Sequence, residues 1–300
     1  MTEESTKKHY SGFVNIVGRP NVGKSTLMNA LVGQRMSIIT NKPQTTRHRI
    51  MGILSDENYQ IVFSDTPGLV SDPAYKMHEA MNNFVEGSFH DADIMLFVTD
   101  MLEAYKEDDP LIEKLQKVDC PLFLIINKID LKKPMEVAKT IQWWNKLILF
   151  TETFPISALK KKNTALVQEH LIKNLPEGPV FYPKDQLTDK SERFFVSEII
   201  REKILLRYKQ EIPYSCEVAI DSFKDDGVLA KIRATIFVGR KTHKSILIGK
   251  DGQAIRSLGI DARRSIETFL QRRLYLELHV KIKENWRNDD RMLKGFGYKQ

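Results

Sequence analysis

The sequence predicts two domains of different class. A doubly wound α/β domain with a mainly parallel sheet is expected over residues 1–175, and an α+β domain over residues 190–300. Apolar strands alternate with helices from residue 13 to residue 172, as a parallel sheet requires, and one antiparallel pair is expected within residues 49–64. After residue 190 the predicted order changes to helix, strand, strand, helix, helix, strand.

Proline and charge separate the same two regions. Three prolines and a glycine fall within residues 175–183, where a helix cannot continue, so residues 176–189 are predicted to be a stiff linker with the hinge at 175–183. Residues 1–175 contain 21 Lys and Arg against 21 Asp and Glu, whereas residues 176–300 contain 25 against 18. The whole net charge of +7 therefore belongs to the second region, which suits a phosphate-bearing partner.

Composition excludes several classes of protein. Apolar residues make up 42% of the chain, but no apolar run approaches the ~18–20 residues of a membrane-spanning helix. The first twelve residues lack the apolar segment of a secretory signal. Cys120 and Cys216 are far apart and each lies at an expected strand edge, which favours core thiols in a reducing compartment. We expect a cytoplasmic monomer.

Residues 18–26 carry the pattern of a phosphate-binding loop between a strand and a helix. The loop consists of Gly18, Arg19, Pro20, Asn21, Val22, Gly23, Lys24, Ser25 and Thr26. The glycines let backbone N–H groups approach phosphate oxygens closely, at the start of a helix whose dipole favours anions. Lys24 is expected to reach the outer phosphates, and the Ser25 hydroxyl to bind Mg²⁺.

A second motif predicts which base is bound. Asn127, Lys128, Ile129 and Asp130 follow an apolar strand. The Asp130 carboxylate can accept hydrogen bonds from the ring N–H and the exocyclic amine of guanine. Adenine would leave that carboxylate unpaired, so we expect guanine nucleotides to be preferred over adenine nucleotides by ~10⁴-fold or more. Ser157 and Ala158 are expected to close the base pocket from another strand end, so the ligand should be GTP or GDP.

A third motif predicts a phosphate sensor. Asp65, Thr66, Pro67 and Gly68 end a strand; Asp65 is expected to hold Mg²⁺ through water, and the Gly68 N–H to contact the γ-phosphate. The polar segment 34–48, which contains Thr45 and Thr46, suits a loop that orders on the γ-phosphate and Mg²⁺. Leu69 follows the motif and cannot orient an attacking water, so intrinsic hydrolysis should be slow.

These motifs resemble those of the translation-factor branch of GTPases. The resemblance implies that Thr46 is the threonine for Mg²⁺ and the γ-phosphate, with Thr45 as the alternative, and that Lys24, Thr46, Asp65 and Gly68 serve hydrolysis. In GTPases with an apolar residue at the position of Leu69, an Asn at the position of Asn21 is associated with a bound K⁺. A simple turn-favouring role for Asn21 is the alternative, and both interpretations stay open.

The second region has its own motif. Helices are predicted at 190–209, 242–248 and 253–271, and strands at 216–221, 229–238 and 274–282, with a hairpin turn at 225–227. This order, with GKDG between the last two helices, resembles the type II KH domain, whose GxxG loop clamps about four nucleotides of single-stranded RNA. Residues 240–273 contain nine Lys and Arg against three acids. The expected RNA-binding residues are Ile248, Gly249, Lys250, Asp251, Gly252, Arg256, Arg263 and Arg264.

A GTPase domain, a proline-rich linker and a terminal KH domain together resemble the Era family of ribosome-assembly GTPases, within the TrmE-Era-EngA-like superfamily. The resemblance spans essentially the whole chain, including residues 44–50 and the tail from Trp286. It implies binding near the 3′ end of small-subunit ribosomal RNA during assembly of the small ribosomal subunit, with GTP gating RNA access.

Two other classes of function are considered. One is a GTPase adaptor linked to growth or division that uses the basic domain peripherally on the inner face of the plasma membrane. The other is a metabolic phosphoryl-transfer enzyme, against which the guanine motif argues.

Overall fold

The computed structural model describes residues 8–40, 42–70, 72–225 and 227–299. Contacts divide the chain into two compact units. Unit 1 comprises Met1–Ser37, Thr46–Val70 and Met81–Asp189, and unit 2 comprises Ile38–Thr45, Ser71–Ala80 and Lys190–Gln300. Two short segments, 38–45 and 71–80, therefore group with the C-terminal part of the chain.

Unit 1 contains a six-stranded sheet of order β2-β3-β1-β4-β5-β6. Its strands are β1 (Tyr10–Val17), β2 (Ile50–Ser55), β3 (Tyr59–Asp65), β4 (Ile94–Asp100), β5 (Leu122–Asn127) and β6 (Glu152–Pro155). Only the β2–β3 pairing within it is antiparallel, as predicted. Every residue of β4 and β5 is buried, which explains their near-continuous apolar sequences. The expected α/β fold class is confirmed.

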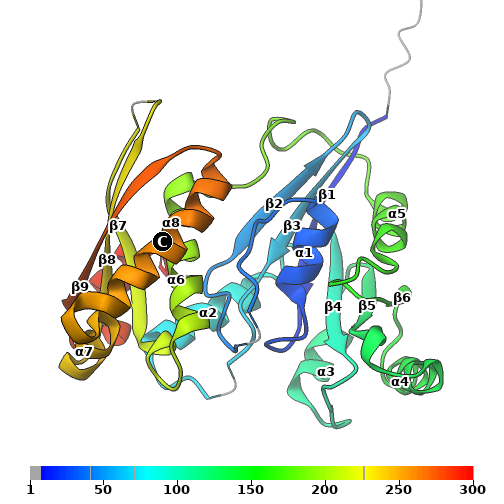
Figure 1. Cartoon of the computed structure of the whole chain (residues 1–300). Coiled ribbons are helices and arrows are strands. Elements are labelled where there is room, and N and C mark those ends of the chain that lie inside the picture. The colour runs from blue at the N-terminus through cyan, green and yellow to red at the C-terminus, as the bar shows by residue number, and fades with distance from the viewer. Residues whose placement is uncertain (1–7, 41, 71, 226, 300) are drawn as a thin grey trace, which may run out of the picture. The chain divides into compact units, whose positions relative to one another are not determined.

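Helices connect these strands. They are α1 (Lys24–Val32), α2 (Lys76–Gly87), α3 (Pro110–Gln116), α4 (Pro134–Leu147) and α5 (Thr164–Asn174), with a 3₁₀ turn η1 (Ile129–Leu131). Figure 1 shows α1 in front of the sheet, and α1 packs on β1, β2 and β3. Because β1, β3, β5 and β6 run in parallel, the loops that follow them emerge at one edge of the sheet, where α/β proteins bind ligands.

The proline-rich segment lies along unit 1. Ser11 donates from its backbone to Pro176 O at 3.0 Å, and Gly178 donates to His9 O at 3.0 Å. Phe181 packs on Phe13 with ring centroids 5.0 Å apart, and the Gln60 side chain accepts from the backbone of Phe181 at 2.8 Å. These contacts are consistent with the division of the chain into units, in which residues up to Asp189 belong to unit 1 and residues from Lys190 to unit 2.

Unit 2 contains a three-stranded sheet of order β7-β8-β9. Its elements are α6 (Glu192–Arg207), η2 (Pro213–Ser215), β7 (Cys216–Lys224), β8 (Ala230–Val238), α7 (Lys241–Ile248), η3 (Lys250–Gly252), α8 (Gln253–Leu270), β9 (Leu274–Ile282), η4 (Trp286–Asn288) and α9 (Asp290–Gly295). The predicted helix–strand–strand–helix–helix–strand order is confirmed. The strand β7 continues past residue 221 because its pairing with β8 resumes after a bulge between Ile220 and Ser222.

The C-terminal tail is part of the core of unit 2. Trp286 is buried and donates from Nε1 to Ser215 O at 3.1 Å. Tyr298 is also buried and donates to Glu217 Oε2 at 2.6 Å. Among the described residues no helix combines the length and the apolar character needed to cross a membrane.

Candidate functional site

The phosphate-binding loop of unit 1 runs from the end of β1 to the start of α1. Gly23 is the N-cap of α1 and supplies no side chain, so the first N–H groups of the helix are available to a phosphate. Lys24 folds back over the loop and donates to Gly18 O and Arg19 O, both at 2.9 Å. Burial lowers the pKa of Lys24 to about 8, against the smaller opposing effect of the Asp65 charge.

Three oxygen-bearing side chains meet beside the start of α1. Ser25 Oγ lies 2.6 Å from Asp65 Oδ2 and 2.8 Å from Thr46 Oγ1. Asp65 is fully buried, and its Oδ1 has no hydrogen-bond partner among the described residues. Burial raises the pKa of Asp65, although the Ser25 hydroxyl and Lys24 oppose the shift. Hard oxygen donors around a buried carboxylate fit Mg²⁺, whose charge would stabilise the ionised form of Asp65.

Gly68 touches the phosphate-binding loop directly. A Cβ on Gly68 would lie 2.6 to 2.8 Å from three atoms of Pro20, two of them backbone, so no larger residue fits without moving the loop. Thr66 anchors the same segment by donating from Oγ1 to Ile16 O at 2.9 Å. The motif that was predicted to sense the γ-phosphate therefore lies against the loop that was predicted to hold it.

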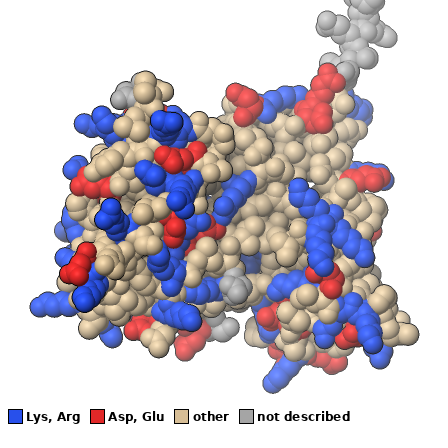
Figure 2. Space-filling view, viewed as in Figure 1, with Lys and Arg blue, Asp and Glu red and all other residues tan. Residues whose placement is uncertain are grey.

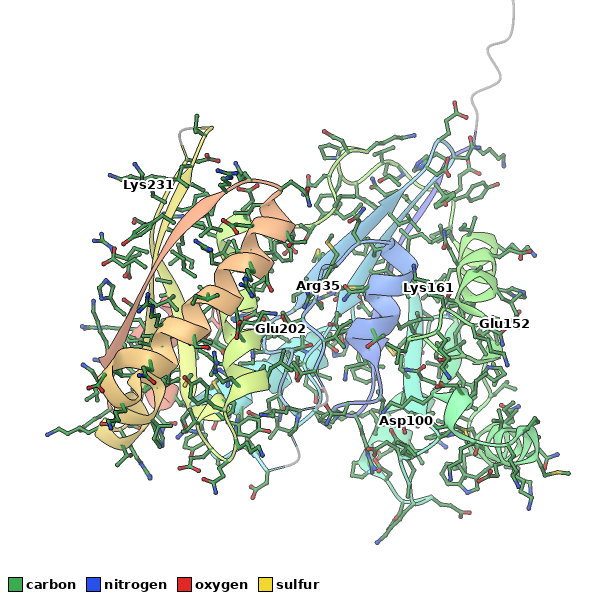
Figure 3. The ribbon with its side chains drawn as sticks, in the orientation of Figure 1. Arg35, Asp100, Glu152, Lys161, Glu202 and Lys231 are labelled. Carbon is green, nitrogen blue, oxygen red and sulfur yellow. The ribbon has the colours of Figure 1, made fainter. Side chains whose placement is uncertain are left out.

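The base motif is tied to the phosphate-binding loop through Asn127 and Lys128. Asn127 Nδ2 donates to Val22 O at 2.9 Å, and Asn127 Oδ1 accepts from Ala158 N at 2.9 Å. Lys128 Nζ donates to Asn21 O at 2.8 Å and pairs with the buried Asp100. Figure 3 shows Asp100 at the end of β4. Asn127 and Lys128 therefore connect the base motif to the phosphate-binding loop through hydrogen bonds.

Asp130 presents the carboxylate that was predicted to read guanine. Its pKa is lowered, first by a hydrogen bond from Ser157 and then by Lys160, whose Nζ lies 3.1 Å from Oδ2. An ionised carboxylate accepts two hydrogen bonds, as the guanine edge requires. The sequence motifs did not include Asp100 or Lys160; the position of Asp100 at the carboxyl end of a parallel strand was the available signal.

Two predicted residues of the phosphate-binding loop, Arg19 and Asn21, make no described side-chain contact with the other predicted site residues. The Arg19 guanidinium donates to Glu103 Oε2 at 3.0 Å and lies 4.0 Å from the Tyr105 ring centroid, so it points to the 103–109 loop. Asn21 is exposed with a positive φ of 64°, and its described contact is through the carbonyl oxygen. Of the other predicted positions, Thr26 lies in the first turn of α1 and Ile129 in η1, whereas Pro67 and Leu69 lie in the loop after β3.

In unit 2 the GKDG loop separates α7 from α8. Gly249 has φ 73°, and a Cβ there would lie 2.6 Å from Ala254 Cβ. Gly252 has φ 72° and open space around it, and it begins α8 without a side-chain cap. The N–H groups of Gly252 and Gln253 already donate to Gly249 O and Lys250 O, so the loop favours an anion through the exposed Lys250 and the positive end of the α8 dipole.

A groove of about 390 Å³ lies between α8 and β9. Arg256 and Arg263 line it together with Ile255, Ile260 and Tyr275, and Figure 2 shows Lys and Arg gathered on the face that carries α8. Arg264 is exposed on the same helix but does not line the groove, and Ile248 packs against the core. Tyr275 was missed by sequence reasoning, although its outward position on an alternating strand was visible.

The geometry defines a P-loop GTPase with a KH domain, and comparisons with known proteins agree. A family model described as "50S ribosome-binding GTPase" matches residues 13–128, and a "KH domain" model matches residues 211–287. The GTPase Era of Clostridium kluyveri is 45% identical over 291 residues, which are 96% of this chain and 99% of that protein.

Two solved structures extend the similarity to the whole fold. A crystal structure of Era in complex with MgGDPNP and nucleotides 1506–1542 of 16S ribosomal RNA has a TM-score of 0.92 and 36% identity. A crystal structure of a variant of Aquifex aeolicus Era bound to GDP·AlF₄⁻ has a TM-score of 0.91 and 37% identity. Each covers 97% of this chain and 100% of the other. The chain belongs to the Era family of GTPases: it binds GTP and GDP with Mg²⁺ and hydrolyses GTP.

Proposed function

We propose that this protein is a GTP-operated switch that binds the 3′-terminal region of 16S ribosomal RNA and acts in assembly of the small ribosomal subunit. The observation that carries the proposal is the GKDG loop at the start of α8, because the same helix lines an open groove with two arginines. The related Era structure that holds nucleotides 1506–1542 of 16S ribosomal RNA supports the choice of RNA.

The nucleotide roles follow from the contacts in unit 1. Lys24 and the N–H groups at the start of α1 would hold phosphates, and Ser25, Thr46 and Asp65 would hold Mg²⁺, which would neutralise phosphate charge. Asp130 reads guanine, with Ser157 and Lys160 keeping it ionised. Leu69 has no polar atom to orient water, so we propose that hydrolysis is slow unless a K⁺ ion held at Asn21, or a partner, supplies positive charge.

The RNA roles follow from the shape and charge of unit 2. The GKDG backbone would hold phosphates, and the apolar floor of the groove, with Ile255 and Ile260, would accept bases. Tyr275 is more than half exposed at the rim, where an aromatic ring can stack on a base. Arg256 and Arg263 add the charge that makes binding dependent on salt.

The test measures fluorescence anisotropy with an RNA that ends in the 3′ sequence of small-subunit ribosomal RNA and with a shuffled RNA of equal length. We expect tighter binding of the native sequence, lost when Lys250 and Asp251 are both replaced by Ala while GTP affinity is kept. Equal binding of both RNAs would overturn the assignment of ribosomal RNA. Binding to acidic vesicles at matched salt, without RNA binding, would support the membrane adaptor instead.

A further inference from the structure

A second polar pocket of unit 2 lies at the start of α7, the end opposite the GKDG loop. Its volume is about 360 Å³. The lining includes Tyr75, Arg240, His243, Asn285, Trp286 and Arg287. None of these residues takes part in the GTP or RNA sites proposed above.

The pocket presents two guanidinium groups. Arg240 is exposed, and its side chain makes no hydrogen bond or ion pair with the described residues. The Arg287 guanidinium lies 3.7 Å from the centroid of the Tyr75 ring, and this cation–π contact fixes its position at the side of the pocket. Glu211 is an acidic member of the lining and is 61% exposed along its side chain, so water screens much of its charge.

Backbone groups at the same place also favour an anion. The helix α7 has eight residues, and its N-cap, Arg240, makes no side-chain capping hydrogen bond. The first intrahelical donor is Lys244, which bonds to Arg240 O at 3.2 Å. The N–H groups before it face the end of the helix where the dipole is positive.

His243 supplies an independent observation that points to a ligand. Its side chain is 5% exposed and lines the pocket, with Nε2 3.5 Å from Glu211 Oε1. The other ring nitrogen, Nδ1, is buried and has no hydrogen-bond partner among the described residues. Leaving such a group unpaired is costly, and a phosphate oxygen in the pocket would accept from a protonated Nδ1 once the His243 ring turns to bring that nitrogen to the pocket surface.

We propose that this pocket binds a phosphate group between Arg240, Arg287 and the start of α7. Two sources share this chemistry: a backbone phosphate of an RNA strand that also contacts the GKDG loop, and a free phosphorylated small molecule. The pocket and the loop lie at opposite ends of α7, about 12 Å apart by helix rise, which a few nucleotides can span. The inference does not depend on the RNA proposal, since the second source needs no RNA.

The experiment uses the full chain saturated with GDP and Mg²⁺, so that the nucleotide site is filled. The protein contains three tryptophans; Trp143 and Trp144 lie in α4, whereas Trp286 lines the pocket. Incorporation of 5-fluorotryptophan therefore gives one ¹⁹F resonance that reports on the pocket. We expect inorganic phosphate to shift the Trp286 resonance saturably, and chloride at equal ionic strength to leave it in place.

Arg240→Gln should weaken phosphate binding about tenfold, the cost of losing a charged hydrogen bond. The matched control is Lys231→Gln, which removes the same charge; Figure 3 shows Lys231 far from α7, toward the hairpin end of unit 2. No saturable shift, or equal affinity in wild type and Arg240→Gln, would overturn the proposal. An equal loss of phosphate affinity in the Lys231→Gln control would mean that only the net charge of the protein matters, and this result would also overturn the proposal.

RNA then distinguishes the two sources. The GKDG loop is expected to hold about four nucleotides. If the pocket binds a phosphate of the same RNA strand, a longer oligonucleotide should shift the Trp286 resonance and displace inorganic phosphate. A tetranucleotide should do neither. If the ligand is a free phosphorylated compound, phosphate should bind equally well with the long RNA present. If the protein binds no RNA at all, the proposed function is contradicted. The phosphate titration still decides separately whether the pocket binds phosphate.

Discussion

At the scale of single residues, burial decides the chemistry of the nucleotide site. Lys24 and Asp65 are both removed from water. Burial lowers the pKa of Lys24 and raises the pKa of Asp65, so in each case it favours the neutral form. A ligand that carries phosphates and Mg²⁺ restores the missing charge partners. Nucleotide binding should therefore change the protonation of these groups as well as fill the pocket.

The pKa of Lys24 leads to a prediction about pH. In the nucleotide-free protein this pKa is about 8, below its ordinary value of 10.5. Phosphate oxygens favour the ammonium, so binding should raise the pKa and take up about half a proton at pH 8. Because the bound state holds more protons, affinity should fall as pH rises above about 8. Calorimetry in buffers of different ionisation enthalpy measures the uptake, and Lys24→Arg, which stays charged, should lack this component.

Asp130 carries the prediction about base selectivity. Asp130→Asn replaces an acceptor by a donor at the edge that meets the base, so preference should move from guanine toward xanthine nucleotides by at least about tenfold. Competition between GTP and XTP for a fluorescent nucleotide measures the change. Ser25→Ala is the control, since it should weaken both nucleotides alike when Mg²⁺ is present. Unchanged GTP preference in Asp130→Asn would refute the role given to Asp130.

The pair Leu69 and Asn21 carries the prediction about hydrolysis. Slow turnover in Na⁺ and faster turnover in K⁺ are expected at equal ionic strength, because a bound cation would replace the missing polar group at Leu69. Phosphate release measured in the two salts decides this. Asn21→Ala should abolish the difference while keeping GDP affinity. Equal rates in both salts would remove K⁺ from the mechanism.

At the scale of elements, the two binding regions use the same device. Both α1 and α8 begin at a glycine that provides no side-chain cap, so a phosphate can approach the positive end of each helix dipole closely. The difference lies in what surrounds each helix start. In unit 1 the site is enclosed by loops from several strands, whereas the GKDG loop borders an open groove that suits a polymer.

Gly252 gives a test of that loop. A Cβ at Gly252 meets no protein atom within 4 Å, so Gly252→Ala should cost only about 1 kcal/mol through its positive φ. RNA affinity should nevertheless fall by roughly tenfold or more, because the phosphate backbone needs the space that the Cβ would fill. Gly227→Ala is the matched control, with φ 82° and equally open surroundings in the β7–β8 turn. Equal RNA affinity in both variants would remove the loop from the interface.

At the scale of the whole molecule, the grouping of segments 38–45 and 71–80 with unit 2 bears on regulation. The first segment directly precedes Thr46, and the second follows the Gly68 motif. Within unit 2, Lys42 Nζ donates to Leu205 O and Tyr208 O at the end of α6, where a cation satisfies free carbonyls. Lys76 donates to Asn288 and Asp290.

These contacts lead to a prediction about coupling between nucleotide binding and RNA binding. If the segment before Thr46 changes with the nucleotide, RNA affinity should differ between GTP-like and GDP states by ~5–150-fold, and RNA should change nucleotide affinity by the same factor. Lys42→Met should reduce this coupling while leaving each separate affinity nearly intact, and Lys209→Met, an exposed lysine, serves as the control. Identical RNA affinity in both states of the wild type would mean two independent domains.

The sequence by itself determined the fold class, the order of elements and the positions of the nucleotide and GKDG motifs. These depend on local spacing: the period of apolar residues, the glycines of a phosphate-binding loop, and an acidic residue after a buried strand. The mainly parallel sheet, its antiparallel pair and the element order of unit 2 were therefore predictable.

Only the tertiary structure decided which residues meet across long distances in the chain. Lys160 reaches Asp130 and Asp100 reaches Lys128 because neighbouring parallel strands end at one edge of the sheet. The groove beside Tyr275, the pocket around His243 and the grouping of residues 38–45 with unit 2 have no sequence motif. Each arises from packing between segments far apart in sequence, and a periodic pattern shows which face of an element is buried without showing what covers it.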